Sequence, residues 1–241
     1  FGSAYLIPAF AVSVLGFTPT DAGQLLLPSG ALFAGALLLA AWLMQGRGLS
    51  PIATVPFGIL LIMAAMWMLS GSSGESGAGD MMPAVLLRGL GLGFLFLSIT
   101  LIAFNALPRA TLASGIALFN IGRQLGGLIG VAGLQTAIDQ QVAASQTVLG
   151  SALNPGAPAV AERLASTVSL LAGRGMDPGS TARAAAAMLG RAVRSEATVI
   201  AFDTAFMLVA LLFVAAAPLI VGLKIALKRR RQRLDMAGAG A

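Results

Sequence analysis

Long runs of apolar residues, separated by short stretches that carry the charges, dominate this chain. Uncharged stretches cover residues 1–20, 22–46 and 48–74, and twenty more uncharged residues separate Arg88 from Arg109. A helix needs about 20 apolar residues to cross the hydrocarbon core of a bilayer. Its backbone hydrogen bonds must close within the segment, because lipid offers no partners. The pattern therefore predicts membrane-spanning helices.

Six such spans are expected, which together predict an all-α integral membrane fold. The first span looks truncated at its start. An outer-membrane β-barrel is excluded, because its strands would alternate polar and apolar residues and the run from Ala31 to Leu39 does not alternate. We place the spans at residues 1–17, 25–44, 52–70, 83–105, 111–138 and 199–223.

Four regions follow from this placement. Residues 1–138 hold the first five spans, and residues 199–223 form the last one. Residues 139–198 are predicted to be a long external, periplasmic loop that is partly helical, with its second helix running into the last span. A disordered linker is the alternative for this Ala- and Gly-rich stretch. Residues 224–241 form a basic tail.

The distribution of Lys and Arg predicts the orientation. Basic residues occur in the short loops near Arg47 and Arg109 and in the tail from Lys224 to Arg233. Short cytoplasmic loops are enriched in Lys and Arg, so these segments and the C-terminus are expected on the cytoplasmic side of the membrane. The alternate short loops lack basic residues and carry Asp21, Glu75 and Asp80.

Composition agrees with a membrane protein and narrows the chemistry. The chain has 241 residues, of which 57% are hydrophobic and 10% charged, and its mean hydropathy is +0.89. The net charge of +6 does not indicate nucleic-acid binding, because six of the fifteen basic residues lie in the tail. The absence of Cys and His removes thiol and imidazole catalysis and the usual zinc ligands. We therefore expect no enzyme, no metal site and no cofactor.

The fifth span contains a polar cluster. Arg123 follows Arg109 by fourteen residues, or about 21 Å of helix, which places it well inside the bilayer. An arginine there costs about 2.5–3.5 kcal/mol on insertion scales and usually faces the protein interior. Asn120 and Gln124 flank it at helical spacing. We predict that Asn120, Arg123 and Gln124 line a substrate cavity or a gate; the alternative is that Arg123 only clamps backbone carbonyls of neighbouring helices.

Glycines recur in the fourth and fifth spans. A run that superficially matches a dinucleotide-binding fingerprint opens the fourth span, but that motif requires a soluble strand-and-helix unit. Small residues in membrane helices permit close packing, as static contacts or as a face that slides. The glycines predicted to pack against other helices are Gly89, Gly91, Gly93, Gly115, Gly122, Gly126 and Gly130.

Motifs in these two spans resemble the major facilitator superfamily. The segments Arg88–Phe94, Ala113–Gly115 and Asn120–Ala132 are more narrowly similar to the fourteen-helix EmrB/QacA-type drug–proton antiporters, and Phe202–Phe206 resembles the EmrB branch. The resemblance implies that the chain is the C-terminal lobe of a two-lobed transporter and that an N-terminal lobe precedes it.

The resemblance also implies a function. Amphipathic small molecules would be exported against proton entry, with the proton gradient as the energy source, and the lobes would rock to alternate access. The family's main proton-coupling acids lie in the N-terminal lobe. Asp203 is the candidate in this chain, and Asp139 also lies near the outer end of a span; solvation of both is the alternative. Besides lipid, the expected partners are the N-terminal lobe, a periplasmic adaptor and an outer-membrane channel.

Two other functions remain open from the sequence. A siderophore or metabolite exporter could share the same fold. A membrane scaffold that transports nothing is a different class. Because the chain has no Gly-rich phosphate loop with a Lys, it shows no ATPase motif.

Overall fold

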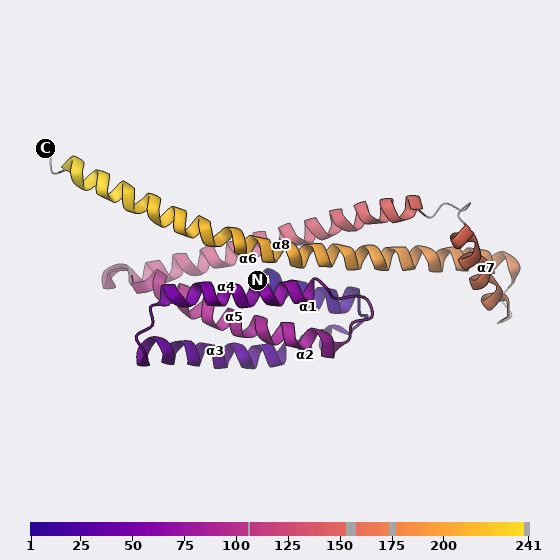
Figure 1. The fold of residues 1–241 in the computed structure, drawn as a ribbon, viewed down its shortest axis with the longest axis horizontal. Helices are drawn as coiled ribbons and strands as arrows, with labels where there is room; N and C mark the ends of the chain where they lie inside the picture. Colours follow the sequence, from indigo (N-terminus) through magenta and orange to yellow (C-terminus); the bar gives the residue numbers. More distant parts are fainter. Residues whose placement is uncertain (106, 153–157, 174–176, 239–241) are drawn as a thin grey trace. The chain divides into compact units, whose positions relative to one another are not determined.

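The helices of the computed structural model follow the apolar runs (Figure 1). The structure describes residues 1–105, 107–152, 158–173 and 177–238. A short 3-10 turn, η1 (Arg109–Thr111), precedes the sixth helix. The α-helices are α1 (Gly2–Ser13), α2 (Pro19–Leu25), α3 (Leu27–Gly46), α4 (Pro51–Leu69), α5 (Ala78–Asn105), α6 (Leu112–Ala152), α7 (Pro158–Ala172) and α8 (Pro178–Gly238).

Five helical segments among the described residues are long and apolar enough to cross a bilayer. The all-α membrane fold class is therefore confirmed, and the protein is a multi-pass membrane protein. The expected first span corresponds to α1, whose twelve residues extend only about 18 Å, less than the hydrocarbon thickness of about 30 Å. The count of six spans stays a prediction. The five segments are Pro19–Gly46, Pro51–Leu69, Ala78–Asn105, Leu112–Ser151 and Ser180–Ala216.

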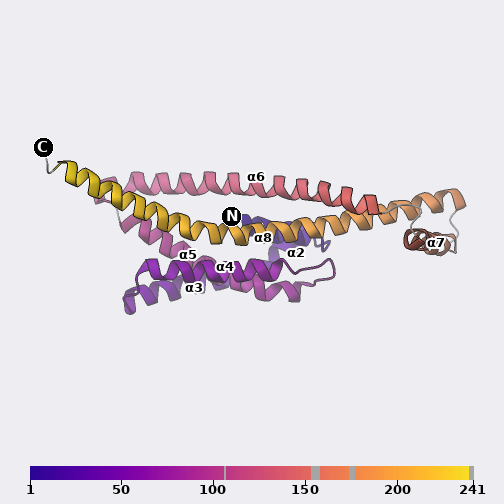
Figure 2. The ribbon, with the colours of Figure 1, turned by 45° about the horizontal axis from the view of Figure 1, so that its top comes forward.

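Helices α6 and α8 are longer than a bilayer is thick. With 41 residues, α6 extends about 62 Å, and α8, with 61 residues, extends about 92 Å. Figure 2 shows α6 as one uninterrupted helix. Helical structure therefore continues from both spans into the region 139–198, which also contains α7. No change of backbone marks where the chain leaves the membrane, so the predicted domain boundaries stay predictions.

The chain divides into two compact units. The first comprises Phe1–Gln24, Ser70–Met81 and Arg123–Phe206, so it contains α1, most of α2, α7, the part of α6 from Arg123 onward and the part of α8 up to Phe206. The second contains α3, α4, most of α5, the start of α6 and the part of α8 after Phe206. Each unit has its own core.

In the second unit, α5 packs against α3 and α4 through an aromatic residue and small side chains. Phe94 is buried together with Ala36 and Ala40 of α3. Its ring also lies edge-to-face with that of Phe57 on α4, with the ring centroids 5.2 Å apart. Such edge-to-face pairs contribute about 0.5–1.5 kcal/mol beyond area burial. Phe94 therefore joins all three helices.

Three glycines allow α5 to approach its neighbours at backbone distance. Gly89 and Gly93 face α3, where a Cβ at Gly89 would overlap the carbonyl of Ser29 and one at Gly93 would lie 2.8 Å from the carbonyl oxygen of Phe33. Gly91 faces α4, where its Cβ would lie 3.0 Å from the carbonyl oxygen of Gly58. Gly89 and Gly93, four residues apart, thus face one neighbouring helix, and Gly91, two residues from each, faces the other.

A polar contact also joins α4 to α5. The hydroxyl oxygens of Thr54 and Ser98 lie 2.7 Å apart in the buried interior. Each hydroxyl also lies within hydrogen-bonding distance of a carbonyl on its own helix, Pro51 for Thr54 and Phe94 for Ser98. Both buried hydroxyls are therefore satisfied, and the pair links the helices where no water is available.

In the first unit, α1 packs against α8 through aromatic rings. Phe10 is buried, and its ring lies edge-to-face with those of Phe202 and Phe206, with centroid distances of 5.6 and 5.9 Å. Leu6 and Ile7 of α1 are fully buried as well. These contacts hold the short α1 to the much longer α8.

The glycine contacts of α5 yield a stability prediction. Gly89→Ala places a methyl group into the backbone of α3, and overpacking of this kind costs about 1–3 kcal/mol. The free energy of unfolding of the purified protein in lipid or detergent should fall by that amount. Gly35→Ala on α3 is the matched control, because a Cβ there meets nothing within 4 Å; its stability should be unchanged or up to about 1 kcal/mol higher. Equal stability of the two variants would contradict the packing role of Gly89.

Candidate functional site

Helix α6 presents polar side chains on an exposed surface within a membrane-spanning segment. Between Leu112 and Gly126 no residue is buried, although this stretch belongs to the apolar segment Leu112–Ser151. Polar and charged side chains in a membrane rarely face lipid; they face other helices or a water-filled cavity. The exposed face of α6 is therefore the candidate functional site.

The three residues predicted from the sequence lie within about one turn of α6 and are all exposed. The side-chain amide of Asn120 donates a hydrogen bond to the carbonyl of Ile116, with a distance of 3.0 Å. The guanidinium carbon of Arg123 lies 5.7 Å from the centre of the Phe1 ring. Gln124 completes the cluster on the same helix. Their roles as cavity-lining or gating residues stay a prediction.

The contact between Arg123 and Phe1 brings the start of the described chain onto α6. A cation over an aromatic face is attracted by the ring, by about 0.5–1 kcal/mol in water and by about 2 kcal/mol or more when desolvated. The ring also lies close to the backbone of Gly127, where a Cβ would lie 2.7 Å from a ring carbon. Sequence reasoning did not single out Gly127, because it breaks the four-residue glycine spacing.

The glycines predicted to pack fall into two groups on the structure. Gly115 faces Leu107, with 2.6 Å between its Cβ position and a Leu107 methyl, and the three α5 glycines lie in the helix contacts described above. At Gly122, Gly126 and Gly130 a Cβ would meet nothing within 4 Å among the described residues. These three lie on the open face of α6, and their use as a packing stripe stays a proposal.

A chain of hydrogen bonds links α1 to α6 further along. The hydroxyl of Tyr5 donates to Oε1 of Gln135, and Nε2 of Gln135 donates to Oδ1 of Asp139, with a distance of 2.9 Å. Sequence reasoning noted Asp139 but missed Tyr5 and Gln135. The four-residue spacing of Gln135 and Asp139 was a visible signal, whereas nothing in the sequence pairs either with Tyr5.

Asp203 and Arg88 are charged side chains in the apolar segments of α8 and α5. Asp203 is partly exposed on α8, between Phe202 and Phe206, which pack on Phe10; its part in proton coupling stays a proposal. Arg88 on α5 is only 6% exposed. Among the described residues no buried side-chain nitrogen or oxygen lacks a hydrogen-bond partner, so the buried guanidinium of Arg88 is satisfied.

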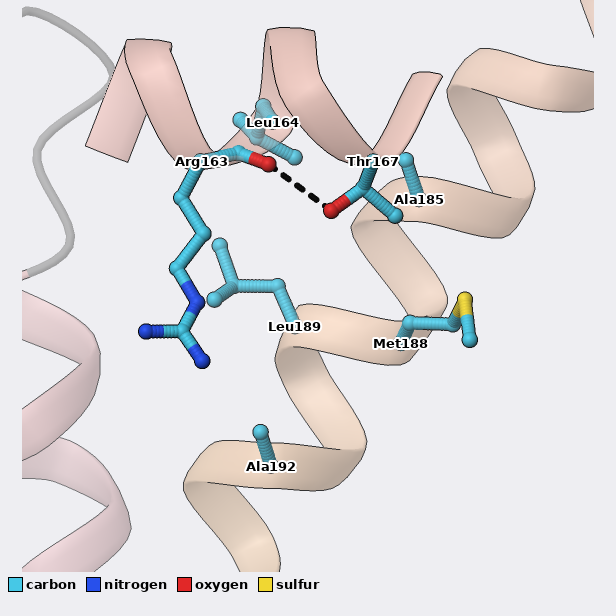
Figure 3. A pocket seen from close by; sticks show the side chains of 7 residues that line it. All are labelled: Arg163, Leu164, Thr167, Ala185, Met188, Leu189 and Ala192. Atoms are coloured by element: carbon cyan, nitrogen blue, oxygen red, sulfur yellow. Dashed lines mark hydrogen bonds between the residues drawn. The ribbon is translucent and has the colours of Figure 1, made fainter. Parts of the chain in front are cut away.

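Neither of the next two hollows among the described residues is lined by α6. Between α4 and α8, a groove of about 350 Å³ is lined only by apolar residues, including Leu60, Trp67 and Leu211, which suits a surface that contacts lipid. Figure 3 shows a smaller pocket between α7 and the N-terminal part of α8. Its volume is about 160 Å³. It is lined by Arg163, Leu164, Thr167, Ala185, Met188, Leu189 and Ala192.

These features define the class of the protein: a multi-pass α-helical membrane protein with a polar face on one spanning helix. Comparison with known proteins shows which members of this class it is similar to. The chain matches no protein-family model. It is similar to the colistin resistance protein EmrB of Acinetobacter baumannii, with 25% identity over 164 residues that cover 68% of this chain and 32% of that protein. It is also similar to the multidrug resistance protein B homolog of Mycobacterium tuberculosis strain H37Rv, with 29% identity over 189 residues that cover 76% of this chain and 32% of the homolog.

These relatives confirm the resemblance to EmrB-type multidrug resistance proteins that the motifs indicated. The chain spans about a third of the length of the curated relatives it matches. What a complete protein of this kind does is therefore inferred below.

Substitutions of Arg123 test the polar face of α6. Arg123→Lys keeps the charge but loses the planar guanidinium group with its five donors. The loss of one charge-assisted hydrogen bond costs about 1.5 kcal/mol or more. This loss should slow dye efflux roughly tenfold at unchanged membrane abundance. Arg123→Leu removes the cost of a charge within a membrane-spanning segment, so it should insert well and still fail to transport. Both quantities can be measured in the same cells, by fluorescence and immunoblotting.

The matched control is Arg47→Lys, because the guanidinium of Arg47 lies over Trp42 at the same centroid distance of 5.7 Å but outside the α6 face. This variant should transport at the normal rate. Full activity of Arg123→Leu would end the functional assignment of the Asn120, Arg123 and Gln124 cluster.

Proposed function

We propose that this chain forms the C-terminal lobe of a secondary transporter that exports amphipathic small molecules in exchange for protons. The observation that carries the proposal is the exposed α6 face, where Asn120, Arg123 and Gln124 lie in a membrane-spanning segment. The names of the relatives, which refer to colistin and multidrug resistance, support export of drugs.

The polar cluster suits a cavity for amphipathic molecules because apolar side chains surround it. Ile121, Leu125 and Leu128 are exposed on the same helix, so α6 offers both apolar surface and a few hydrogen-bonding groups. Pockets for small molecules usually combine these two kinds of surface. We infer that the α6 face meets the N-terminal lobe across the substrate path and that the lobes rock to alternate access.

A siderophore or metabolite exporter of the same fold is the second candidate. The exposed guanidinium of Arg123 favours it, because arginine binds carboxylates and phosphates in a bidentate manner. An anionic substrate would therefore gain more from this site than a cationic drug. A scaffold that transports nothing would not require the polar side chains on this face of α6.

We further propose on which side of the membrane the tail and the α7 region lie, and which kind of protein binds there. The basic tail would lie in the cytoplasm beneath the inner membrane, and α7 with the outer part of α8 would lie in the periplasm. The pocket between them could receive an apolar side chain of a periplasmic adaptor that leads to an outer-membrane channel. Its lining includes Met188, which is 51% exposed.

The transport proposal is tested by dye efflux from cells that express the full-length protein. Efflux should exceed that of cells without the protein and should collapse when an uncoupler dissipates the proton gradient. Competition with an anionic siderophore and with a cationic dye separates the two substrate classes. A protein that inserts normally and exports neither class would be a scaffold, and the transport proposal would be wrong.

The docking proposal is tested by Met188→Glu, which places a charge at the apolar rim of the pocket. Export into the medium should fall, and substrate should accumulate in the periplasm, while membrane abundance is unchanged. Leu170→Glu is the matched control, because Leu170 of α7 is 70% exposed and is not part of the pocket lining. Equal export by the two variants would show that the pocket is not the docking surface.

A further inference from the structure

The groove between α4 and α8 is bordered by one stripe of side chains on each helix. The stripe on α4 begins at Leu60 and ends at Trp67, and the stripe on α8 begins at Met207 and ends at Val214. In both stripes the lining residues are spaced by three, one and three positions, which places them on one face of a helix. Both stripes belong to the second unit. The groove therefore follows the two helices over about 10 Å.

Small side chains within the two stripes create the hollow. Ala64 and Ala210 both line the groove, and Ala210 is buried. Around them Leu60, Trp67 and Leu211 are each at least 60% exposed. The long side chains thus form the walls, and the alanines form the floor, of a hollow of about 350 Å³.

Hydrocarbon is the solvent of this hollow. Its α4 stripe lies in the segment Pro51–Leu69 and its α8 stripe in the segment Ser180–Ala216, both apolar and long enough to cross a bilayer. The lining carries no charge, and its only side-chain hydrogen-bond donor is the indole N–H of Trp67. Apolar hollows of this kind do not hold water. If the hollow stayed empty, its side chains would lose dispersion contacts on one side, so an apolar occupant is favoured.

The size of the hollow favours an alkyl chain over a helix. One turn of an α-helix, with a diameter of about 10 Å and a pitch of about 5.4 Å, displaces roughly 400 Å³, which exceeds the volume of the whole hollow, about 350 Å³. A helix of a second copy or of another lobe would therefore rest on the walls and leave the floor unfilled. An acyl chain is only as wide as a methylene group, and it runs nearly parallel to membrane helices, whose mean tilt is about 20°.

We propose that this groove is a lipid-binding site, which holds one acyl chain of a membrane phospholipid against Ala64 and Ala210. The chain occupies the space that larger side chains would fill, and its dispersion contacts with both stripes join α4 to α8. Lipid binding is independent of the proposed function, because it requires neither a substrate nor a proton.

The site is tested by the fluorescence of Trp67, which forms part of its wall. The full-length protein, with every Trp except Trp67 replaced by Phe, is purified in detergent and titrated with phosphatidylcholine that carries bromine on its acyl chains, because bromine quenches an indole on contact. Quenching should level off near one lipid per protein. A second protein keeps only Trp42, which is exposed on α3 outside the groove. It should require a roughly tenfold higher lipid concentration for half-quenching, a difference in affinity of about 1.4 kcal/mol.

Filling the floor of the groove should displace the acyl chain. In the protein that keeps only Trp67, Ala210→Leu adds three carbon atoms to the floor and should raise the half-quenching concentration to that of Trp42. Ala64→Leu fills the same space from α4 and should act alike, which keeps the test valid if one variant folds poorly. Ala34→Leu is the matched control, because Ala34 is exposed on α3 and does not line the groove; Trp67 should be quenched as in its parent protein.

Three results would overturn the inference. Trp67 and Trp42 that are quenched at the same lipid concentration would show that lipid only surrounds the protein. Unchanged quenching of Trp67 in both groove-filling variants would show that the acyl chain does not reach the floor. A Trp67 that lipid fails to quench at any concentration would show that a protein surface, from a second copy or another lobe, covers the groove.

Discussion

Backbone-to-backbone contact between helices is the constraint on which the second unit depends. In lipid, apolar surface does not drive helices together, because the acyl chains are as apolar as leucine. Association then relies on dispersion forces, which fall off steeply with distance, and on interhelical polar contacts. Glycine supplies the necessary closeness at Gly89, Gly91 and Gly93, and the hydroxyl pair of Thr54 and Ser98 adds a polar contact in the same interface. A single methyl group at these positions would separate the helices.

Two exposed surfaces of the described structure differ in how well lipid can solvate their side chains. The groove between α4 and α8 is lined by apolar side chains, which lipid solvates well. The face of α6 carries an amide, a guanidinium and a second amide in one turn, and lipid solvates none of these. A protein can retain such a face only if another surface or water covers it. This difference in side-chain chemistry, rather than exposure itself, makes α6 the site on which the proposed transport function is built.

Helix α1 is held to its neighbours by two different kinds of contact. Its buried side, with Phe10 between two rings of α8, has fixed edge-to-face contacts. Its other contacts, through Phe1 and Tyr5 to α6, involve a cation and a chain of hydrogen bonds. The contact of α1 with α8 is therefore apolar, whereas its contact with α6 is polar.

The sequence by itself determined the class of this protein. Apolar runs of about 20 residues without charge permit only membrane-spanning helices, because an unpaired backbone group in lipid is too costly. The sequence also marked Arg123, since a charge in such a run stands out, and it marked the α5 glycines. Only the tertiary structure decided that Gly89 and Gly93 meet one helix while Gly91 meets another, and that Gly122, Gly126 and Gly130 face open space. It also brought Tyr5 to Gln135, 130 residues along the chain. Helical periodicity fixes which residues share a face of one helix, but which helix covers that face depends on packing between distant segments, which no local pattern encodes.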